Sequence, residues 1–258
     1  MKSILRTGAF IVMMMVISGF DTPAKKVNSY GPGEFLEYSL NYGFIKGGKG
    51  YLTVNDTLIN GVKVNHVVAK GETVGLADAL FSVRDRYESF IDPTNDLPVK
   101  SVRSIKEGRY KYYDEVTYNH DSLYVVSKLK GTQPVPSRIQ DILSAFYYAR
   151  NFKFNDSLKK DEIIEIMTYF SNELFPLRIR YRGIENVSTK FGDVQCYRFS
   201  PVTEKGRAFA TEDDMHVWIS RDNNRIPVRI QFDLSVGSFN CVLENYKNLK
   251  NPFISLIK

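Results

Sequence analysis

Apolar and polar residues alternate along most of this chain, and the alternation predicts a protein built mainly from β-strands. The clearest example is MHVWISRDNNRIPVRIQF, residues 215–232, in which two alternating runs flank a turn of Asp, Asn and Arg. Similar runs recur between turns rich in Gly, Pro, Asn and Asp. The expected strands cover residues 34–44, 50–59, 62–73, 85–92, 98–108, 109–119, 122–130, 162–170, 174–183, 193–201, 215–220, 226–232 and 235–246.

The 215–232 hairpin divides its side chains between two faces, because successive residues of a strand point in opposite directions. One face carries Met215, Val217, Ile219, Ile226, Val228, Ile230 and Phe232. The other face carries His216, Trp218, Arg225, Arg229 and Gln231. Pro227 cannot donate a ladder hydrogen bond, so it places its strand at a sheet edge or at a bulge. Turn chemistry explains residues 222–225, and the two arginines fit either anion binding or solvated edge charges.

One segment changes to a helical period. In PSRIQDILSAFYYARN the residues on one face are Ile139, Ile142, Leu143, Phe146, Tyr147 and Arg150. This spacing predicts a helix near residues 138–151, with Ser137 and Gln140 as a capping box. The segment GLADALFS near residue 78 is a shorter helix candidate.

About 12–14 short strands and one main helix predict a large curved antiparallel sheet or a partly open barrel. So many strands curl, split or close, and a helix with one apolar face can fill the concave side. That arrangement gives either a packed core or a partly lined groove. Residues 25–258 are expected to form one mainly-β domain, with a possible subdivision near residue 135.

The first residues have the pattern of a signal peptide. MKSILRTGAFIVMMMVISGF contains Lys2 and Arg6, followed by an apolar run from Ala9 to Ile17 that is too short to span a bilayer comfortably. We expect residues 1–24 to be removed and the protein to be periplasmic or secreted; an uncleaved anchor is the alternative. No Cys lies directly after the apolar run, so a lipoprotein is not expected, and no later stretch is apolar enough to span a membrane.

The net charge argues against one class of partner, and the two cysteines leave a disulfide undecided. Removing residues 1–24 lowers the formal charge from +6 to about +5, and the basic residues are scattered, so a nucleic-acid partner is not expected. Cys196 and Cys241 are the only cysteines. In an oxidising compartment they form either a disulfide or two buried thiols.

No motif for catalysis or metal binding is visible. His66, His120 and His216 are far apart in sequence and lack ligand spacing, so no metal and no cofactor are expected. No serine lies in a Gly-x-Ser-x-Gly elbow, and the segment KGGKGYL lacks the end of a phosphate-binding loop.

The candidate ligand-binding residues are aromatic or basic. Tyr147, Tyr148 and Arg150 lie on the helix that would line a groove, and Tyr combines an apolar ring with a polar tip. Trp218 on the hairpin completes the candidate set. Core packing is the competing interpretation for Tyr147.

Several motifs together resemble a known family. They are EFLEYSLNYGFIKGGKGYLTV, QDILSAFYYAR, FPLRIRYRGIENV with FGDVQCYRFSP, VWISRDNNRIPVRI and VGSF. In this order, from about residue 33 to residue 246, they resemble the exported bacterial proteins catalogued as domain of unknown function 3108 (DUF3108). The hairpin alone is similar to one in periplasmic lipoprotein carriers. The family resemblance implies export and a mainly β fold, and it brings no activity and no functional residues.

These observations favour a non-catalytic cell-envelope protein that binds an apolar or amphiphilic molecule, such as a lipid, or another envelope component. One alternative is an interaction protein that docks a protein or polysaccharide through a sheet edge or an aromatic face. An envelope hydrolase is a further alternative, and it would need titratable side chains that converge in a cleft.

Overall fold

The structure is a computed structural model that describes residues 26–43, 45–202, 214–233 and 237–257. The expected signal peptide therefore lies outside the described residues. The elements are β1 (Phe35–Tyr42), β2 (Ile45–Ile59), β3 (Val62–Thr73), α1 (Gly75–Leu80), β4 (Arg84–Ile91), β5 (Pro98–Glu107), β6 (Tyr110–Asn119), β7 (Tyr124–Ser127), β8 (Gly131–Pro134), α2 (Ile142–Phe152), β9 (Ile163–Phe170), β10 (Glu173–Thr189), β11 (Gly192–Pro201), β12 (Met215–Ser220), β13 (Pro227–Asp233), β14 (Ser238–Lys247) and β15 (Leu256–Ile257).

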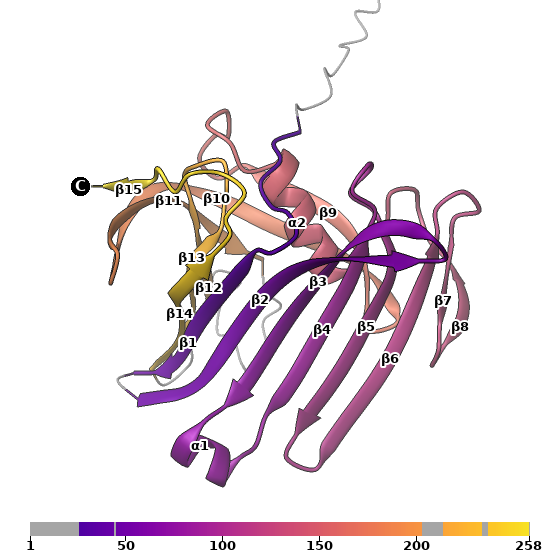
Figure 1. The fold of residues 1–258 in the computed structure, drawn as a ribbon, viewed down its shortest axis with the longest axis horizontal. Coiled ribbons are helices and arrows are strands. Elements are labelled where there is room, and N and C mark those ends of the chain that lie inside the picture. The colour runs from indigo at the N-terminus through magenta and orange to yellow at the C-terminus, as the bar shows by residue number, and fades with distance from the viewer. Residues whose placement is uncertain (1–25, 44, 203–213, 234–236, 258) are drawn as a thin grey trace, which may run out of the picture.

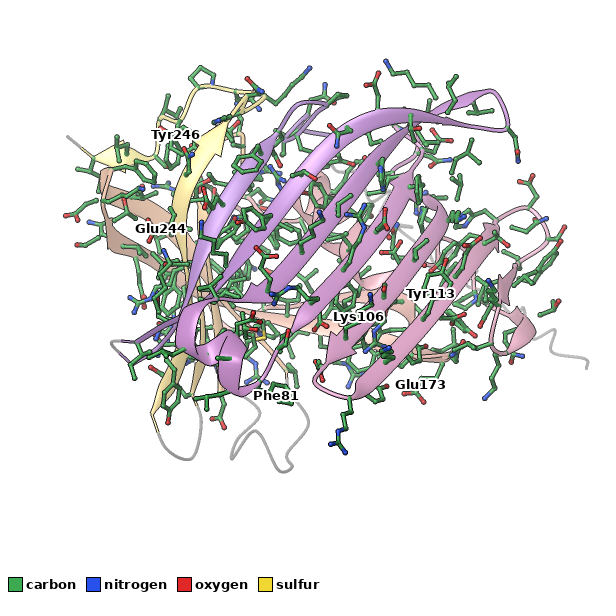
Figure 2. All side chains as sticks on the ribbon, turned by 60° about the horizontal axis from the view of Figure 1, so that its bottom comes forward. Phe81, Lys106, Tyr113, Glu173, Glu244 and Tyr246 are labelled. Atoms are coloured by element: carbon green, nitrogen blue, oxygen red, sulfur yellow. The ribbon has the colours of Figure 1, made fainter. Side chains whose placement is uncertain are left out.

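The strands form one large antiparallel sheet that curls without closing (Figure 1). Their order is β8-β7-β6-β5-β4-β3-β2-β1-β14-β13-β12-β11-β10-β9, and β15 pairs with β11. The predicted fold class is thereby confirmed. The first strand lies beside the last long one, and Figure 2 shows Glu244 and Tyr246 of β14 next to β1. Strands β8 and β15 were not predicted, because both are short and neither alternates clearly.

Helix α2 lies on the concave side of the sheet, as expected (Figure 1). One side of the helix packs on the wing formed by β9–β12 through Ala145 and Ala149. The other side packs on β2–β4 through Leu143 and Tyr147. The two wings of the curled sheet thus share one helix as their core.

The predicted start of this helix is wrong by several residues. The N-cap is Asp141, whose side chain accepts from the amides of Leu143 and Ser144, while the Ser144 hydroxyl accepts from the Asp141 amide. The predicted capping box at Ser137 and Gln140 does not form. Gln140 instead exchanges backbone hydrogen bonds with β9, so the chain stays extended until residue 141. The shorter helix near residue 78 is confirmed as α1.

The 215–232 hairpin is confirmed, with one correction. Pro227 begins β13 at a bulge opposite Ile219 in an interior strand, which confirms the bulge and not the sheet edge of the two predicted alternatives. The bulge places two consecutive residues opposite one. Val228 therefore packs with Trp218 and not with Ile230 as predicted.

Candidate functional site

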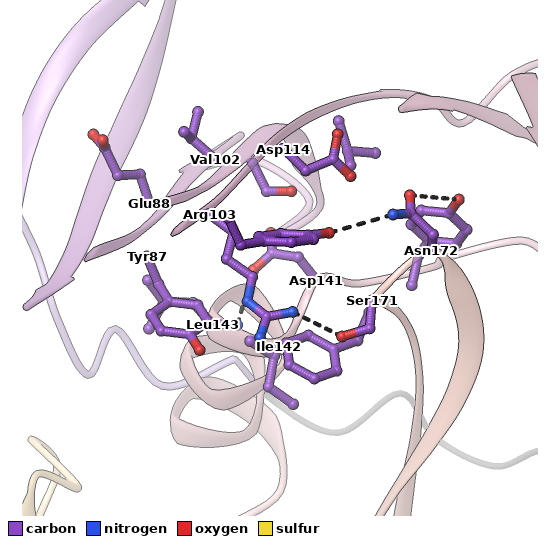
Figure 3. A pocket seen from close by; sticks show the side chains of 15 residues that line it. Tyr87, Glu88, Val102, Arg103, Asp114, Asp141, Ile142, Leu143, Ser171 and Asn172 are labelled. Atoms are coloured by element: carbon purple, nitrogen blue, oxygen red, sulfur yellow. Dashed lines mark hydrogen bonds between the residues drawn. The ribbon is translucent and has the colours of Figure 1, made fainter. Parts of the chain in front are cut away.

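A pocket on the concave side is centred on Arg103 of β5 (Figure 3). Its guanidinium carbon lies 5.5 Å from the ring centroid of Tyr87, 4.8 Å from Tyr112 and 4.7 Å from Phe170. The rings come from β4, β6 and the end of β9, so the pocket joins the two wings of the sheet. Such rings attract a cation electrostatically and hold the guanidinium in place.

The Arg103 guanidinium has unused hydrogen-bond donors. Its Nη1 donates to the Ser171 hydroxyl at 2.7 Å. Its Nε is buried and has no acceptor, and no carboxylate forms an ion pair with Arg103 in the described part of the chain. A buried donor without a partner is uncommon in proteins and points to a water, an ion or a ligand group beside it.

Three carboxyl groups line the same pocket, and all three already have internal partners. Glu88 pairs with His66 and Arg86. Asp114 accepts from the Ser127 hydroxyl and the Leu129 amide. Asp141 accepts from the Ser89 hydroxyl at 2.6 Å as well as capping α2. Burial raises the pKa of Asp141 above its ordinary value, although the hydrogen bonds from Ser89 and Ser144 oppose that shift. The unsatisfied groups at this site are therefore donors.

The pocket is small. Its cavity volume is about 40 Å³, which holds two or three water molecules. The remaining lining is largely apolar and includes Val102, Val116, Ile142 and Leu143. The site fits a compact acceptor such as a carboxylate, carbonyl or phosphate oxygen, and it does not fit a whole lipid.

A larger hollow lies on the opposite face of the sheet. Its volume is about 470 Å³, and it is lined by Phe35, Tyr51, His66 and Arg86 among others. His66 bonds Glu88 at 2.6 Å and stacks on Phe90. Arg86 also pairs with Glu88. His66 and Arg86 are therefore both matched by Glu88, and among the described residues no buried donor without a partner lines this hollow.

Two of the four predicted ligand residues are enclosed in the core. Tyr147 and Arg150 are both 0% exposed. Tyr147 packs edge-on against Tyr30 at 4.6 Å between ring centroids. The helical period placed both residues correctly on the inner face of α2, but that face meets other side chains and not an open groove.

Arg150 is the centre of a buried polar network. It binds Glu34 through two hydrogen bonds of 2.7 and 2.8 Å, and Glu34 is almost fully buried. It also donates to the carbonyls of Ser29 and Asn224. Burial lowers the pKa of Arg150, but the Glu34 carboxylate more than offsets this, so its pKa is raised and its charge is kept.

Arg225 belongs to the same network, which corrects its interpretation as an edge charge. It is 7% exposed, and its Nη1 donates to the Arg150 carbonyl at 2.6 Å. The turn itself has the predicted chemistry, since Asp222 accepts from the amides of Asn224 and Arg225.

Tyr148 and Trp218 lie apart from each other and from the pocket. Tyr148 is partly buried against Phe152, with the Arg138 guanidinium over its ring. Trp218 is buried, and its indole N–H donates to Glu185 at 2.8 Å. The four predicted residues therefore do not gather into one site.

The cysteines are both free thiols, so the possible disulfide does not form. Cys196 lies on β11 and Cys241 on β14, with β12 and β13 between them. Three strand spacings of roughly 4.8 Å each keep their Cα atoms much farther apart than a disulfide allows. Burial raises the pKa of Cys241 to about 12, so it is no nucleophile at neutral pH.

One arrangement that the sequence did not reveal involves a serine, a histidine and an aspartate. His216 Nδ1 lies 3.3 Å from the Ser200 hydroxyl, and His216 Nε2 lies 3.2 Å from Asp233. Ser200 is only 1% exposed and lines none of the pockets described above. The Arg198 guanidinium, 3.4 Å from the same Nδ1, competes with the hydroxyl for that nitrogen.

Across the described ranges, no three His, Cys, Asp or Glu side chains come together as a metal ion requires. No helix there is both long and apolar enough to cross a bilayer.

Comparison with known proteins identifies the family. The model of the family described as "Protein of unknown function (DUF3108)" matches residues 37–244. The chain belongs to the DUF3108 family. This match confirms the resemblance seen in the sequence. No curated protein sequence matches the chain.

Two solved structures are similar to this DUF3108 protein. One is a β-barrel-like protein of domain of unknown function DUF1849 from Brucella abortus, with 10% identity and a TM-score of 0.52, covering 87% of this chain and 98% of that one. The other is a DUF1329 family protein from Desulfovibrio piger ATCC 29098, with 12% identity, coverage of 83% and 84%, and a TM-score of 0.21. The first shows a shared fold alone, and the second supports no conclusion.

The DUF3108 match includes the Arg103 pocket, which sequence reasoning missed. The available signal was weak: strand alternation places Arg103 on the same face of β5 as Ser101 and Ile105, and this is the inner face of the sheet. A lone arginine on a strand face gives no information about rings that arrive from other strands.

Proposed function

We propose that this DUF3108 protein is an exported, non-catalytic envelope protein that binds a small amphiphile, with the polar end of the ligand on Arg103. Export is supported by the basic and apolar segments at the N-terminus. Ligand binding is supported by one observation above all, the buried Arg103 Nε that lacks an acceptor.

The lining of the pocket suggests how such a ligand would lie. An oxygen of a carboxylate or phosphate would accept from Arg103, and a charge-assisted hydrogen bond of this kind is stronger than a neutral one. The volume of about 40 Å³ admits only the head of the molecule. The apolar part would extend from the pocket past Ile142 and Leu143, which supply apolar surface at its edge.

The test is native mass spectrometry of the protein purified from its own envelope, followed by titration with dodecanoate. We expect wild type to carry or take up an acidic amphiphile, and Arg103→Met to lose it, because methionine preserves apolar bulk but has no donor. The matched control is Arg86→Met on neighbouring β4, whose side chain faces the other side of the sheet and pairs with Glu88.

Three outcomes would contradict the proposal. Wild type that neither carries an amphiphile nor binds dodecanoate indicates that the pocket holds water only. Equal binding by Arg103→Met places any ligand elsewhere. Equal loss by Arg86→Met shows a general effect of removing an arginine.

The Ser200–His216–Asp233 group supports a second candidate function, hydrolysis. We expect a fluorophosphonate probe to leave wild type unlabelled, because the Ser200 hydroxyl is buried and Arg198 competes for the histidine. The measurement is intact mass after incubation with the probe. Stoichiometric labelling that disappears in Ser200→Ala would overturn the non-catalytic proposal and favour a serine hydrolase.

A further inference from the structure

We propose that one end of the sheet, formed by α1 and the two turns beside it, docks onto an anionic lipid surface. We call this surface the α1 rim; its apolar members are Tyr42, Ile45, Leu76, Leu80, Phe81 and Tyr110, and its cationic members are Lys46, Lys106, Arg109 and Lys111. The inference does not depend on the Arg103 pocket.

The helix at this rim presents its large apolar side chains outward. Leu76 is 84% exposed and Leu80 is 88% exposed, although they stand four residues apart on one face of α1. The small Ala77 faces the sheet instead, 3.6 Å from the position that a Cβ on Gly47 would take. The helix thus contacts β2 through a small alanine side chain and exposes its two leucines.

The orientation of α1 is fixed and not incidental. Arg84 binds Asp78 through two hydrogen bonds of 2.7 and 2.9 Å, and the Thr73 hydroxyl donates to the same carboxylate. These bonds hold the pKa of Asp78 well below its ordinary value. The outward leucines therefore belong to a defined structure.

Contacts on both sides of α1 join it to the neighbouring turns. The Val74 amide donates to the Gly47 carbonyl near the start of β2. On the other side the Gly108 amide donates to the Ser82 carbonyl, and the Phe81 ring lies against Gly108. Figure 2 shows Phe81 beside α1 and Lys106 near the end of a neighbouring strand. The exposed Ile45, at 70%, and Tyr110, at 56%, extend the apolar surface to both turns.

The charge of the rim identifies the kind of partner. Lys46, Lys106, Arg109 and Lys111 are exposed, and none forms an ion pair within the described ranges. The one carboxylate of α1, Asp78, is already matched by Arg84. Asp85 and Glu107 also lie beside the rim; their side chains interact with each other, and Asp85 accepts from the Lys106 amide. Exposed apolar side chains surrounded by unpaired cations are the pattern of a surface that inserts shallowly between anionic lipid headgroups.

The test is co-sedimentation of the purified protein with vesicles of phosphatidylcholine containing about 30% phosphatidylglycerol. We expect wild type to bind these vesicles and to bind pure phosphatidylcholine at least about tenfold more weakly, because the cations then have no anionic partner. Leu76→Ser with Leu80→Ser, and separately Lys106→Gln with Arg109→Gln and Lys111→Gln, should each lower the partition coefficient by about tenfold.

Matched controls are available at other positions. Leu58 and Val62, 67% and 58% exposed, lie at the opposite ends of β2 and β3, so Leu58→Ser with Val62→Ser should bind as wild type does. Lys159→Gln, Lys160→Gln and Lys250→Gln together remove the same charge elsewhere. Arg103→Met should also keep vesicle binding, which separates this inference from the proposed function.

The inference fails if wild type does not sediment with the anionic vesicles. It also fails if the rim variants bind as well as wild type, or if a control lowers binding as much as its rim counterpart does. Circular dichroism melting curves of each variant ensure that lost binding does not reflect unfolding.

Discussion

Replacing Arg150 with methionine is expected to lower the free energy of unfolding by about 3–5 kcal/mol, the usual cost of leaving one partner of a buried ion pair alone. Both side chains of the Arg150–Glu34 pair are 0% exposed, so water cannot solvate the carboxylate that remains. The carbonyls of Ser29 and Asn224 lose their donors as well. Urea denaturation followed by tyrosine fluorescence measures the change.

A double variant separates the ion pair from simple packing. Glu34→Leu combined with Arg150→Met removes both charges, so it should cost clearly less than the sum of the two single changes. The exposed pair Lys63 and Asp56 is the control, and Lys63→Met should leave the urea midpoint almost unchanged because water screens both charges. A loss below about 1 kcal/mol in Arg150→Met would show that the network contributes little.

Replacing Tyr147 with alanine is expected to cost a similar amount, about 3–5 kcal/mol, because a fully buried ring leaves a cavity that the neighbouring strands cannot fill. Replacing it with phenylalanine should cost less than about 1 kcal/mol. The Tyr147 hydroxyl is buried beside the Arg150 guanidinium and makes no hydrogen bond of normal geometry in the described part of the chain, so its removal loses little.

The pair of Tyr147 variants also tests the earlier candidate role of this residue. If Tyr147 acts through its ring in the core, Tyr147→Phe keeps both the urea midpoint and dodecanoate binding. A Tyr147→Phe protein that is stable but no longer binds dodecanoate would instead assign the hydroxyl to a ligand.

Local periodicity was sufficient to predict most elements of this fold. The hairpin at residues 215–232 and the helical face from Leu143 to Arg150 each repeat one pattern over several residues, and burial on one side enforces that pattern. The number of such runs predicted a large curled sheet. Because only one long amphipathic helix was predicted, its apolar face was expected to pack on the concave side of that sheet.

Contacts between distant residues explain the errors. The N-cap is Asp141 and not Ser137 because Gln140 pairs with β9, more than twenty residues later in the chain. Arg150 looked like a ligand residue because its partner Glu34 is 116 positions away. The Arg103 pocket draws its rings from three other strands, and no spacing within β5 could have revealed them.

The position of β14 determines when the two halves of the sheet can join. It lies between β1 and β13, and it joins the wing that begins with β1 to the wing that ends with β9. A nascent chain that has reached residue 237 therefore holds two half-sheets without the strand that connects them. The complete sheet therefore forms only once β14 is free to pair with β1 on one side and β13 on the other.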